Sequence, residues 1–273
     1  MTLPPNTRSI VVCVSDSKPA KPQSLFKTIA TWYCSQWKAI VAEFVAMVFL
    51  MSFGCMSGIP LEGFDVLPPL QGPLGFGLTV MMNIQIFGHL SGAYMNPFVA
   101  IIACIFGKIS IVLTIIYIII ECLGSIVGYA IVMSVSSYDM VENEVCLTLP
   151  HARINEYQTL GVEIILSAAL SLLNCALWDP QYAARQDSAA IKFGLSIIVL
   201  SIAGGHLTGA SMNPARTLGP AFWNGRWDAH WVYWVGPMVG GILPAIFYKY
   251  VWLKISEIET VENEQSANEV KDK

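Results

Sequence analysis

Two loops of nearly identical sequence each place an Asn where its side chain could bind a small molecule. Residues 88–97 read GHLSGAYMNP and residues 205–214 read GHLTGASMNP, so eight of the ten positions are identical. Asn is a favoured helix N-cap and Pro is favoured at the first helical position, so Asn96 and Asn213, each followed by Pro, should each open a helix. The side-chain amide of each Asn can then donate hydrogen bonds to a solute oxygen. This pattern predicts recognition of a polar solute without bond-making chemistry.

The elements that must position these loops are too apolar for a soluble protein. The 273 residues are 55% hydrophobic and only 12% charged, with a mean hydropathy of +0.57. A helix that crosses the hydrocarbon needs about 20 mostly apolar residues. Six windows fit: Ile40–Gly58, Leu74–Gly88, Ile109–Met133, Gly161–Leu177, Lys192–Ala203 and His230–Trp252. Runs such as Ile111–Ile120 lack the alternation of a β-barrel, so we predict an all-α membrane protein with six transmembrane helices.

The repeat extends beyond the two loops. Phe76–Thr79 and Phe193–Ser196 match at the same offset of 117 residues. Each copy holds three spanning helices, so the second enters from the opposite face, which predicts an inverted repeat about an axis in the membrane plane. From Asn96 to Gly107, a rise of ~1.5 Å per residue gives about 18 Å, roughly half of a ~30 Å hydrocarbon core. We therefore expect two half-spanning re-entrant helices whose N-termini meet near the midplane.

The backbone before each Asn should line a polar path. Non-helical backbone at the membrane midplane is tolerated only along a polar cavity. The Gly-rich segments His89–Tyr94 and His206–Ser211 would leave carbonyl groups free to accept hydrogen bonds from passing solutes. Two positive helix ends that face each other oppose the passage of cations. The sequence therefore predicts a single-file path that refuses protons and metal ions.

The basic residues predict the orientation in the membrane. Of the 15 Lys and Arg residues, all but Arg153, Arg216 and Arg226 fall on one side of the predicted spans. Cytoplasmic loops carry this excess, so both termini should be cytoplasmic, with the plasma membrane as the default location. Residues 1–37 are too polar for a signal peptide.

Composition also divides the chain into segments. We expect a cytoplasmic N-terminal segment at 1–37, a channel domain at 38–254 and a tail at 255–273 that is acidic and disordered. Within the channel domain, the first repeat is expected at 38–135 and the second at 157–254.

The seven cysteines show no pattern of a known site. Cys55, Cys104, Cys122 and Cys175 lie inside or near apolar spans, and no CxxC spacing occurs. We therefore predict neither a disulfide framework nor a metal site. The sequence also contains no catalytic constellation, which predicts a protein that is not an enzyme, needs no cofactor and binds no nucleic acid.

The motifs together resemble the aquaporin (major intrinsic protein) superfamily over nearly the whole chain. The resemblance rests on the paired Asn-Pro loops, on NPAR at Asn213–Arg216 and on Gly236-Pro237. It implies a passive channel in the lipid bilayer that forms a homotetramer with one pore per subunit. It also implies an outer selectivity filter of four positions, which by counting from the motifs are Phe76, Ser201, Ala210 and Arg216. The motif residues at the pore centre are Asn96, Pro97, Phe98, Asn213, Pro214 and Ala215.

The filter residues suggest which solutes pass. Water-selective members of the family carry a His at the second filter position, whereas this chain has the small Ser201. A filter with Phe76 as an apolar wall and Arg216 as a donor suits glycerol and urea as well as water. Thr217 after the Arg, and Tyr233-Trp234 later, are typical of water channels. This mixture resembles the entomoglyceroporins of insects.

Three acidic residues in the predicted spans and one aromatic residue in the first half-spanning helix need an explanation. Glu43 and Glu163 occupy equivalent places in the first helix of each half, and such residues brace the re-entrant loops in this family. Glu121 has no partner that the sequence identifies, so it is protonated, bonded to a neighbouring helix, or a regulatory proton site. Phe98 stands where the family usually has Ala, and it either changes the pore width or packs.

Three other functions are consistent with parts of this pattern. A strictly water-selective pore would result if Phe98 or a loop residue filled the space beside Ser201. An ion-coupled transporter also uses inverted repeats and broken helices, and it would show saturation and ion coupling. A poorly conducting junction or adhesion protein would show almost no water permeability despite delivery to the cell surface.

Overall fold

The computed structural model describes residues 25–60, 68–181 and 187–253, and the regular structure of these residues is helical. The chain separates into two units, residues 1–37 and 38–273. Of the first unit, the described part is the beginning of the first helix. The tail predicted at 255–273 lies outside the described residues. The second unit carries both Asn-Pro loops and all six predicted spans.

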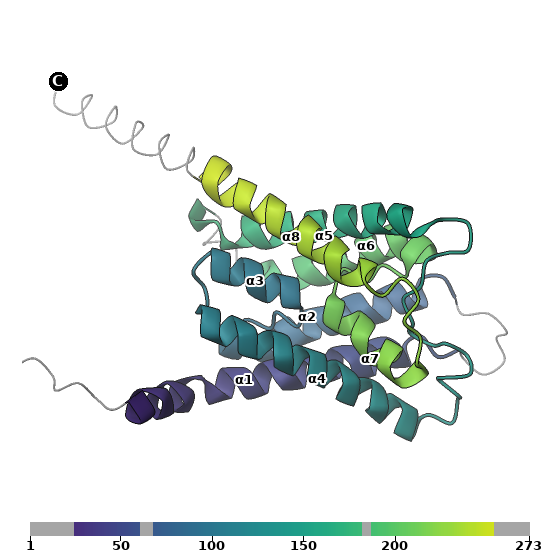
Figure 1. The fold of residues 1–273 in the computed structure, drawn as a ribbon, viewed down its shortest axis with the longest axis horizontal. Helices are drawn as coiled ribbons and strands as arrows, with labels where there is room; N and C mark the ends of the chain where they lie inside the picture. The colour runs from purple at the N-terminus through teal and green to yellow at the C-terminus, as the bar shows by residue number, and fades with distance from the viewer. Residues whose placement is uncertain (1–24, 61–67, 182–186, 254–273) are drawn as a thin grey trace, which may run out of the picture. The chain divides into compact units, whose positions relative to one another are not determined.

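Eight α-helices follow one another along the described chain (Figure 1). They are α1 (Leu25–Met56), α2 (Gln71–Ser91), α3 (Pro97–Ile105), α4 (Ile111–Val135), α5 (Glu156–Trp178), α6 (Ala189–Thr208), α7 (Pro214–Asn224) and α8 (Val232–Phe247). A short π-helix, Tyr248–Trp252, continues α8. The six predicted spans correspond to α1, α2, α4, α5, α6 and α8. The half-spanning helices are α3, with nine residues, and α7, with eleven.

Length and hydropathy mark four of the described helices as able to cross a membrane. They are Cys34–Met56 within α1, and α4, α5 and α6. α2 is less apolar because it carries Asn83 and Gln85, and α8 is shorter. α4 turns a row of large apolar side chains outward, a surface that lipid solvates and water does not. The row comprises Ile111, Val112, Ile115, Ile119, Leu123, Val127, Ile131 and Val135.

Two helices extend further than predicted. We expected ends at Gly88 and Ala203, because we took the following Gly-rich sequences as loops. The helices continue to Ser91 and Thr208, and each is ended by a glycine in the left-handed region, Gly92 with φ +96° and Gly209 with φ +78°. A glycine inside a helix costs only about 1 kcal/mol relative to alanine. Apolar packing offsets this cost, so each helix continues through its earlier glycines.

The two halves meet through α2 and α6, which pack against each other. A Cβ at Gly77 would lie 2.5 Å from the carbonyl oxygen of Gly194, and one at Gly194 would lie 2.8 Å from that of Gly77. The two glycines are separated by the repeat offset, so the contact is reciprocal, as expected at a pseudo-two-fold axis. Figure 1 shows α3 and α7 between the long helices of this unit, running outward from its middle toward opposite ends.

A disulfide joins Cys55, at the end of α1, to Cys146, in the loop between α4 and α5. The expectation of no disulfide was therefore wrong. The two residues are 91 positions apart, and a link of this kind depends on proximity in the folded chain that spacing motifs do not report. One signal was present: both cysteines fall on the side of the predicted spans that is poor in Lys and Arg.

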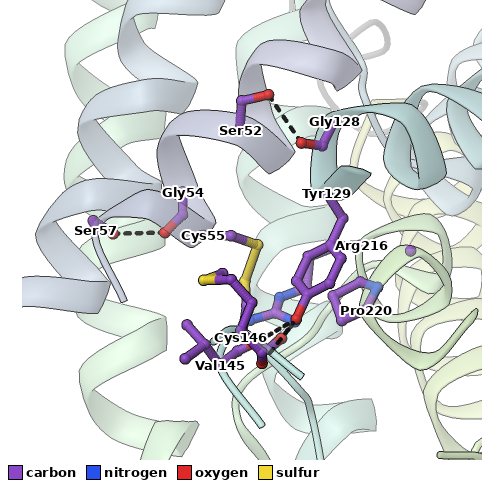
Figure 2. The surroundings of a disulfide bond; sticks show 12 residues. Ser52, Gly54, Cys55, Ser57, Gly128, Tyr129, Val145, Cys146, Arg216 and Pro220 are labelled. Carbon is purple, nitrogen blue, oxygen red and sulfur yellow. Dashed lines mark hydrogen bonds between the residues drawn. A yellow bond between two sulfur atoms is a disulfide. The ribbon is translucent and has the colours of Figure 1, made fainter. Parts of the chain in front are cut away.

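The loop that carries Cys146 is folded against the helix ends (Figure 2). The hydroxyl of Tyr129, on α4, lies 3.0 Å from the carbonyl oxygen of Val145 and 3.3 Å from that of Met140 and donates to them. Further along the loop, the backbone N–H of His151 donates to the carbonyl oxygen of Leu207 at 2.8 Å. The loop is therefore attached to both halves of the channel.

Candidate pore and selectivity filter

The two motif Asn residues cap the short helices. Asn96 is the N-cap of α3, and its Oδ1 accepts from the backbone N–H of Phe98 at 3.2 Å. Asn213 is the N-cap of α7, and its Oδ1 accepts from Ala215 at 3.0 Å and from Arg216 at 3.2 Å. Each Asn oxygen is thus turned toward its own helix, and its amide nitrogen is turned away.

The amide nitrogens link the two loops to each other. Nδ2 of Asn96 donates to the carbonyl oxygen of Met212 at 2.7 Å, and Nδ2 of Asn213 donates to that of Met95 at 2.7 Å. These reciprocal bonds hold the N-termini of α3 and α7 together. An amide carries two N–H groups, so each Asn keeps one donor for a solute in the cavity that both residues line.

The backbone before each Asn is held in an unfavourable conformation. Ala93 and Met95 in the first loop have φ of +49° and +50°, and Ala210 and Met212 in the second have φ of +45° and +50°. The left-handed region costs a residue other than glycine roughly 1–2 kcal/mol. The loops therefore need partners outside themselves.

Glu163 and Glu43 are such partners. Oε1 of Glu163 accepts from the hydroxyl of Thr208 at 2.7 Å and from the backbone N–H of Ser211 at 3.0 Å, and its Oε2 accepts from Met212 at 2.8 Å. Glu43 accepts from the backbone N–H of Met95 in the first loop. Both carboxyl groups are completely buried. Both oxygens of Glu163 accept from loop donors that would otherwise be unsatisfied, whereas Glu43 satisfies the loop N–H of Met95 with one oxygen.

Glu121 gives the first loop a second carboxyl group that the second loop lacks. Its Oε1 accepts from the backbone N–H of Asn96 at 3.0 Å, and it lies beside Glu43. The equivalent N–H of Asn213 donates to the hydroxyl of Ser211 at 3.3 Å. Of the three interpretations of Glu121, the geometry bears on the bonded one, and the donor belongs to the first loop rather than to a neighbouring helix. The sequence did not show the partner because that partner is a backbone group.

The four predicted filter residues line one cavity of about 810 Å³. Phe76 comes from α2, Ser201 from α6, Ala210 from the second loop and Arg216 from α7. The same cavity reaches Asn96 and Asn213 and continues past them to Trp178. It therefore connects the four predicted filter positions, the two loops and the opposite end of the helix bundle.

Arg216 is held from two sides. Its Nη1 donates to the carbonyl oxygen of Cys146 at 2.6 Å, and its Cζ lies 4.8 Å from the centre of the Phe76 ring, within range of a cation–π interaction. Only 8% of the residue is exposed. The guanidinium is thus a fixed cationic donor at the cavity wall.

Phe98 lies away from the cavity. It is completely buried, belongs to an apolar cluster with Val99 and Ile102, and is absent from the described residues that line the cavity. A Cβ at Gly241 of α8 would lie 2.2 Å from the Phe98 ring. Of the two interpretations that the sequence left open, this position supports packing.

Replacing Phe98 with Ala should therefore destabilise the protein without opening the pore. We expect the free energy of unfolding to fall by about 3–5 kcal/mol, because a buried ring is lost over Gly241. Water permeability per delivered molecule should stay within about twofold. Thermal unfolding in detergent and osmotic swelling of proteoliposomes measure the two effects, and a several-fold rise in permeability would show that the ring obstructs the pore.

Two parts of the cavity wall were not predicted. At the end opposite the filter, Trp178 contacts Tyr94 and Phe106 with ring-centre distances of 6.0 and 5.5 Å, and Tyr94 also lines the cavity. At the other end, Cys146 lines the cavity beside Arg216. Trp178 directly follows the predicted span Gly161–Leu177 and is the last residue of α5. The role of Cys146 was not visible, because its carbonyl oxygen makes the contact.

A further group of charged side chains lies outside the residues that line the cavity. Arg226 forms ion pairs with Glu144 and with Asp228, and the hydrogen bond from Arg226 lowers the pKa of the Asp228 carboxyl. These pairs are exposed and contribute little stability. Among the described residues, no group of three or more His, Cys, Asp or Glu is placed to hold a metal ion.

Comparison with known proteins agrees with this geometry. The family Major intrinsic protein matches residues 30–248. Aquaporin-4 of Rattus norvegicus is 35% identical over 231 residues, which cover 84% of this chain and 71% of the relative. The lens fiber major intrinsic protein of Rattus norvegicus is 36% identical over 217 residues, which cover 80% of this chain and 82% of the relative.

A solved structure has the same fold. The X-ray structure of the aquaglyceroporin from Plasmodium falciparum superposes with a TM-score of 0.69 and 24% identity, over 82% of this chain and 99% of that chain. At this identity the likeness establishes the fold alone. Members of the matched family are channels rather than enzymes. From the family match, the relatives and the paired re-entrant loops, the chain belongs to the major intrinsic protein family, the aquaporins, and forms a passive membrane channel.

Proposed function

We propose that this channel conducts water and small uncharged solutes such as glycerol and urea, and that it excludes protons and ions. The observation that carries the proposal is Ser201, a small hydroxyl residue on the same cavity as Phe76 and Arg216. The aromatic ring offers an apolar wall to a carbon chain, and the guanidinium and the Ser hydroxyl offer hydrogen bonds to solute oxygens. The assignment to the entomoglyceroporin subgroup also depends on Ser201 and stays a prediction.

Exclusion of cations is supported by the centre of the cavity. The N-termini of α3 and α7 meet through the reciprocal bonds of Asn96 and Asn213, so two positive helix ends face the same point. A cation would lose its hydration there and meet donors rather than acceptors. Arg216 adds a fixed positive charge at the outer end.

We further propose that both termini lie in the cytoplasm and that the disulfide end faces outward at the plasma membrane. Disulfides persist in oxidising compartments, and Cys55–Cys146 lies at the end of the bundle that is poor in Lys and Arg. The distribution of basic residues and the disulfide are independent observations that favour one orientation. A homotetramer follows from the family resemblance.

Specific contacts bear on the rival functions. Phe98 packs against α8, which removes the proposed cause of a poorly conducting junction or adhesion protein. An ion-coupled transporter needs a site that changes shape, whereas the two loops here are fixed to each other and to buried carboxyl groups. In a strictly water-selective pore, a bulky residue would fill the space beside Ser201. In this cavity Ser201 and its neighbour among the filter positions, Ala210, are both small.

The proposal is tested by the permeability of proteoliposomes that contain the full chain. Water, glycerol and urea should all enter faster than in empty vesicles, with uptake linear in concentration and insensitive to Na⁺ and H⁺ gradients. Sorbitol should not enter. Uptake of water alone would establish a water-selective pore, saturable and ion-dependent uptake would establish a transporter, and failure of every permeant in correctly inserted protein would favour the junction or adhesion protein.

A further inference from the structure

We propose that the Cys55–Cys146 disulfide positions the guanidinium of Arg216, so that a covalent link at the outer mouth controls passage through the filter. The inference rests on the proposed function in one respect, that Arg216 contacts the permeating molecules. It adds two positioning residues to the filter that neither the repeat nor the four filter positions contain.

The link from sulfur to guanidinium passes through a single residue. Cys146 bonds through its side chain to Cys55 and through its carbonyl oxygen to Nη1 of Arg216, at 2.6 Å. The side chain and the carbonyl group share one Cα, so a constraint on the sulfur restricts the direction of the carbonyl. Figure 2 shows the disulfide, the Val145–Cys146 backbone and the Arg216 side chain together.

The backbone of Cys146 requires such a constraint. Its φ is +70°, and Glu144, two residues earlier, has φ +50°. Residues with a Cβ disfavour this left-handed region, and the surrounding structure must hold them there. The conformation that aims the Cys146 carbonyl at Arg216 is therefore not one that this loop would prefer by itself.

This part of the loop has several attachments, including the ion pair of Glu144 with Arg226 and the bond of 2.8 Å between the hydroxyls of Thr148 and Thr217. Two others lie nearest to Cys146. The first is the Tyr129 hydroxyl, which contacts the carbonyl oxygens of Met140 and Val145 and in turn accepts from Nδ2 of Asn224. The second is Cys55, which is completely buried in an apolar cluster at the end of α1. The Tyr129 contacts end at Val145, and the other attachments are at Glu144 and Thr148, so the disulfide is the bond that holds the Cys146 side chain.

Loss of the disulfide should therefore release the carbonyl and leave the fold in place. Tyr129 would still hold the loop, but the Cys146 carbonyl could turn to a more favourable conformation. Arg216 would then lose its charge-assisted hydrogen bond to the Cys146 carbonyl oxygen. Its guanidinium would instead donate to acceptors in the pore, where water and solutes pass. A mobile cationic side chain at the level of Phe76 and Ser201 should obstruct glycerol more than water.

The test is reduction of protein that is already inserted. A membrane-impermeant phosphine is added outside proteoliposomes. Its phosphorus attacks one sulfur of the disulfide, and the second sulfur leaves as a thiolate. Water then hydrolyses the phosphorus–sulfur bond, which releases the attacked sulfur as a thiol and converts the phosphine to its oxide. Labelling of the two new thiols reports completion. We expect glycerol permeability to fall at least about fivefold and water permeability about twofold, with recovery on reoxidation.

Three variants separate positioning of Arg216 from a general structural effect. Cys55→Ser with Cys146→Ser should show the reduced permeabilities and no response to the phosphine. Cys34→Ser, which removes an exposed free thiol, should respond as the wild type does. In Arg216→Ala the response should vanish, because the group that the disulfide positions is absent.

Unchanged permeabilities in protein whose two thiols have been labelled would overturn the inference, as would an equal response in Arg216→Ala. A wild-type protein that passes water but no glycerol would contradict the proposed function alone. The inference would then be decided by the water permeability, which should still fall about twofold on reduction.

Discussion

Replacement of Ser201 with His is expected to abolish glycerol permeation and to preserve water permeation. The imidazole would project into the cavity that Ser201 shares with Phe76 and Arg216, and it would fill the space needed by a three-carbon solute. Glycerol permeability should fall at least about tenfold, while water permeability should stay within about threefold. Stopped-flow light scattering on proteoliposomes with equal protein content measures both.

Ser201→Ala is the matched control for this substitution, because it removes the hydroxyl and keeps the small volume. Its glycerol permeability should remain within about twofold of wild type. If Ala abolishes glycerol passage as His does, the hydroxyl and not the width decides selectivity. If His changes nothing, the narrowest level lies elsewhere, and the ring pair of Tyr94 and Trp178 at the other end becomes the first alternative.

Replacement of Glu163 with Leu should strongly destabilise the protein and disturb the second loop. It would leave the buried backbone N–H groups of Ser211 and Met212 and the hydroxyl of Thr208 without their acceptor. We expect the free energy of unfolding to fall by roughly 3–5 kcal/mol. Thermal unfolding in detergent measures the loss, and the water permeability of any protein that inserts should fall with it, because the second loop forms the cavity wall.

Glu163→Gln provides the control. Its side-chain oxygen can still accept from Thr208 and Ser211, but its amide nitrogen would face the N–H of Met212, so the loss should be about half of that in the Leu variant. Equal stability of the Leu variant and wild type would show that the loop conformation does not depend on Glu163. Since the loop contains Ala210 and Met212 at positive φ, that outcome would require another source of support.

The features of the fold that were predictable have periodic or repeated sequence signals. The six spans and the two short helices follow from apolar length and from the duplicated Asn-Pro loops. The helix ends at Ser91 and Thr208 were missed because glycines inside the last turns look like loop residues. The disulfide was missed because Cys55 and Cys146 share no spacing motif and meet only in the folded chain.

The site was predictable where side chains identify it and not where backbone groups do. Phe76, Ser201, Ala210 and Arg216 could be located by counting from the motifs, and they line one cavity. The partners of Glu121 and Arg216 are the N–H of Asn96 and the carbonyl oxygen of Cys146. Every residue other than proline has both groups, so a sequence carries no signal that singles out these two.

The reciprocal bonds between the loops also set an order of events while the chain is being made. The carbonyl oxygen that accepts from Asn96 belongs to Met212, 116 positions later. At about 5–20 residues per second, ribosomes need roughly 6–23 s to synthesise the intervening segment. During that interval the side-chain amide of Asn96 lacks the carbonyl oxygen of Met212 as its acceptor. The centre of the channel can therefore be completed only after the second half has been synthesised and has packed against the first.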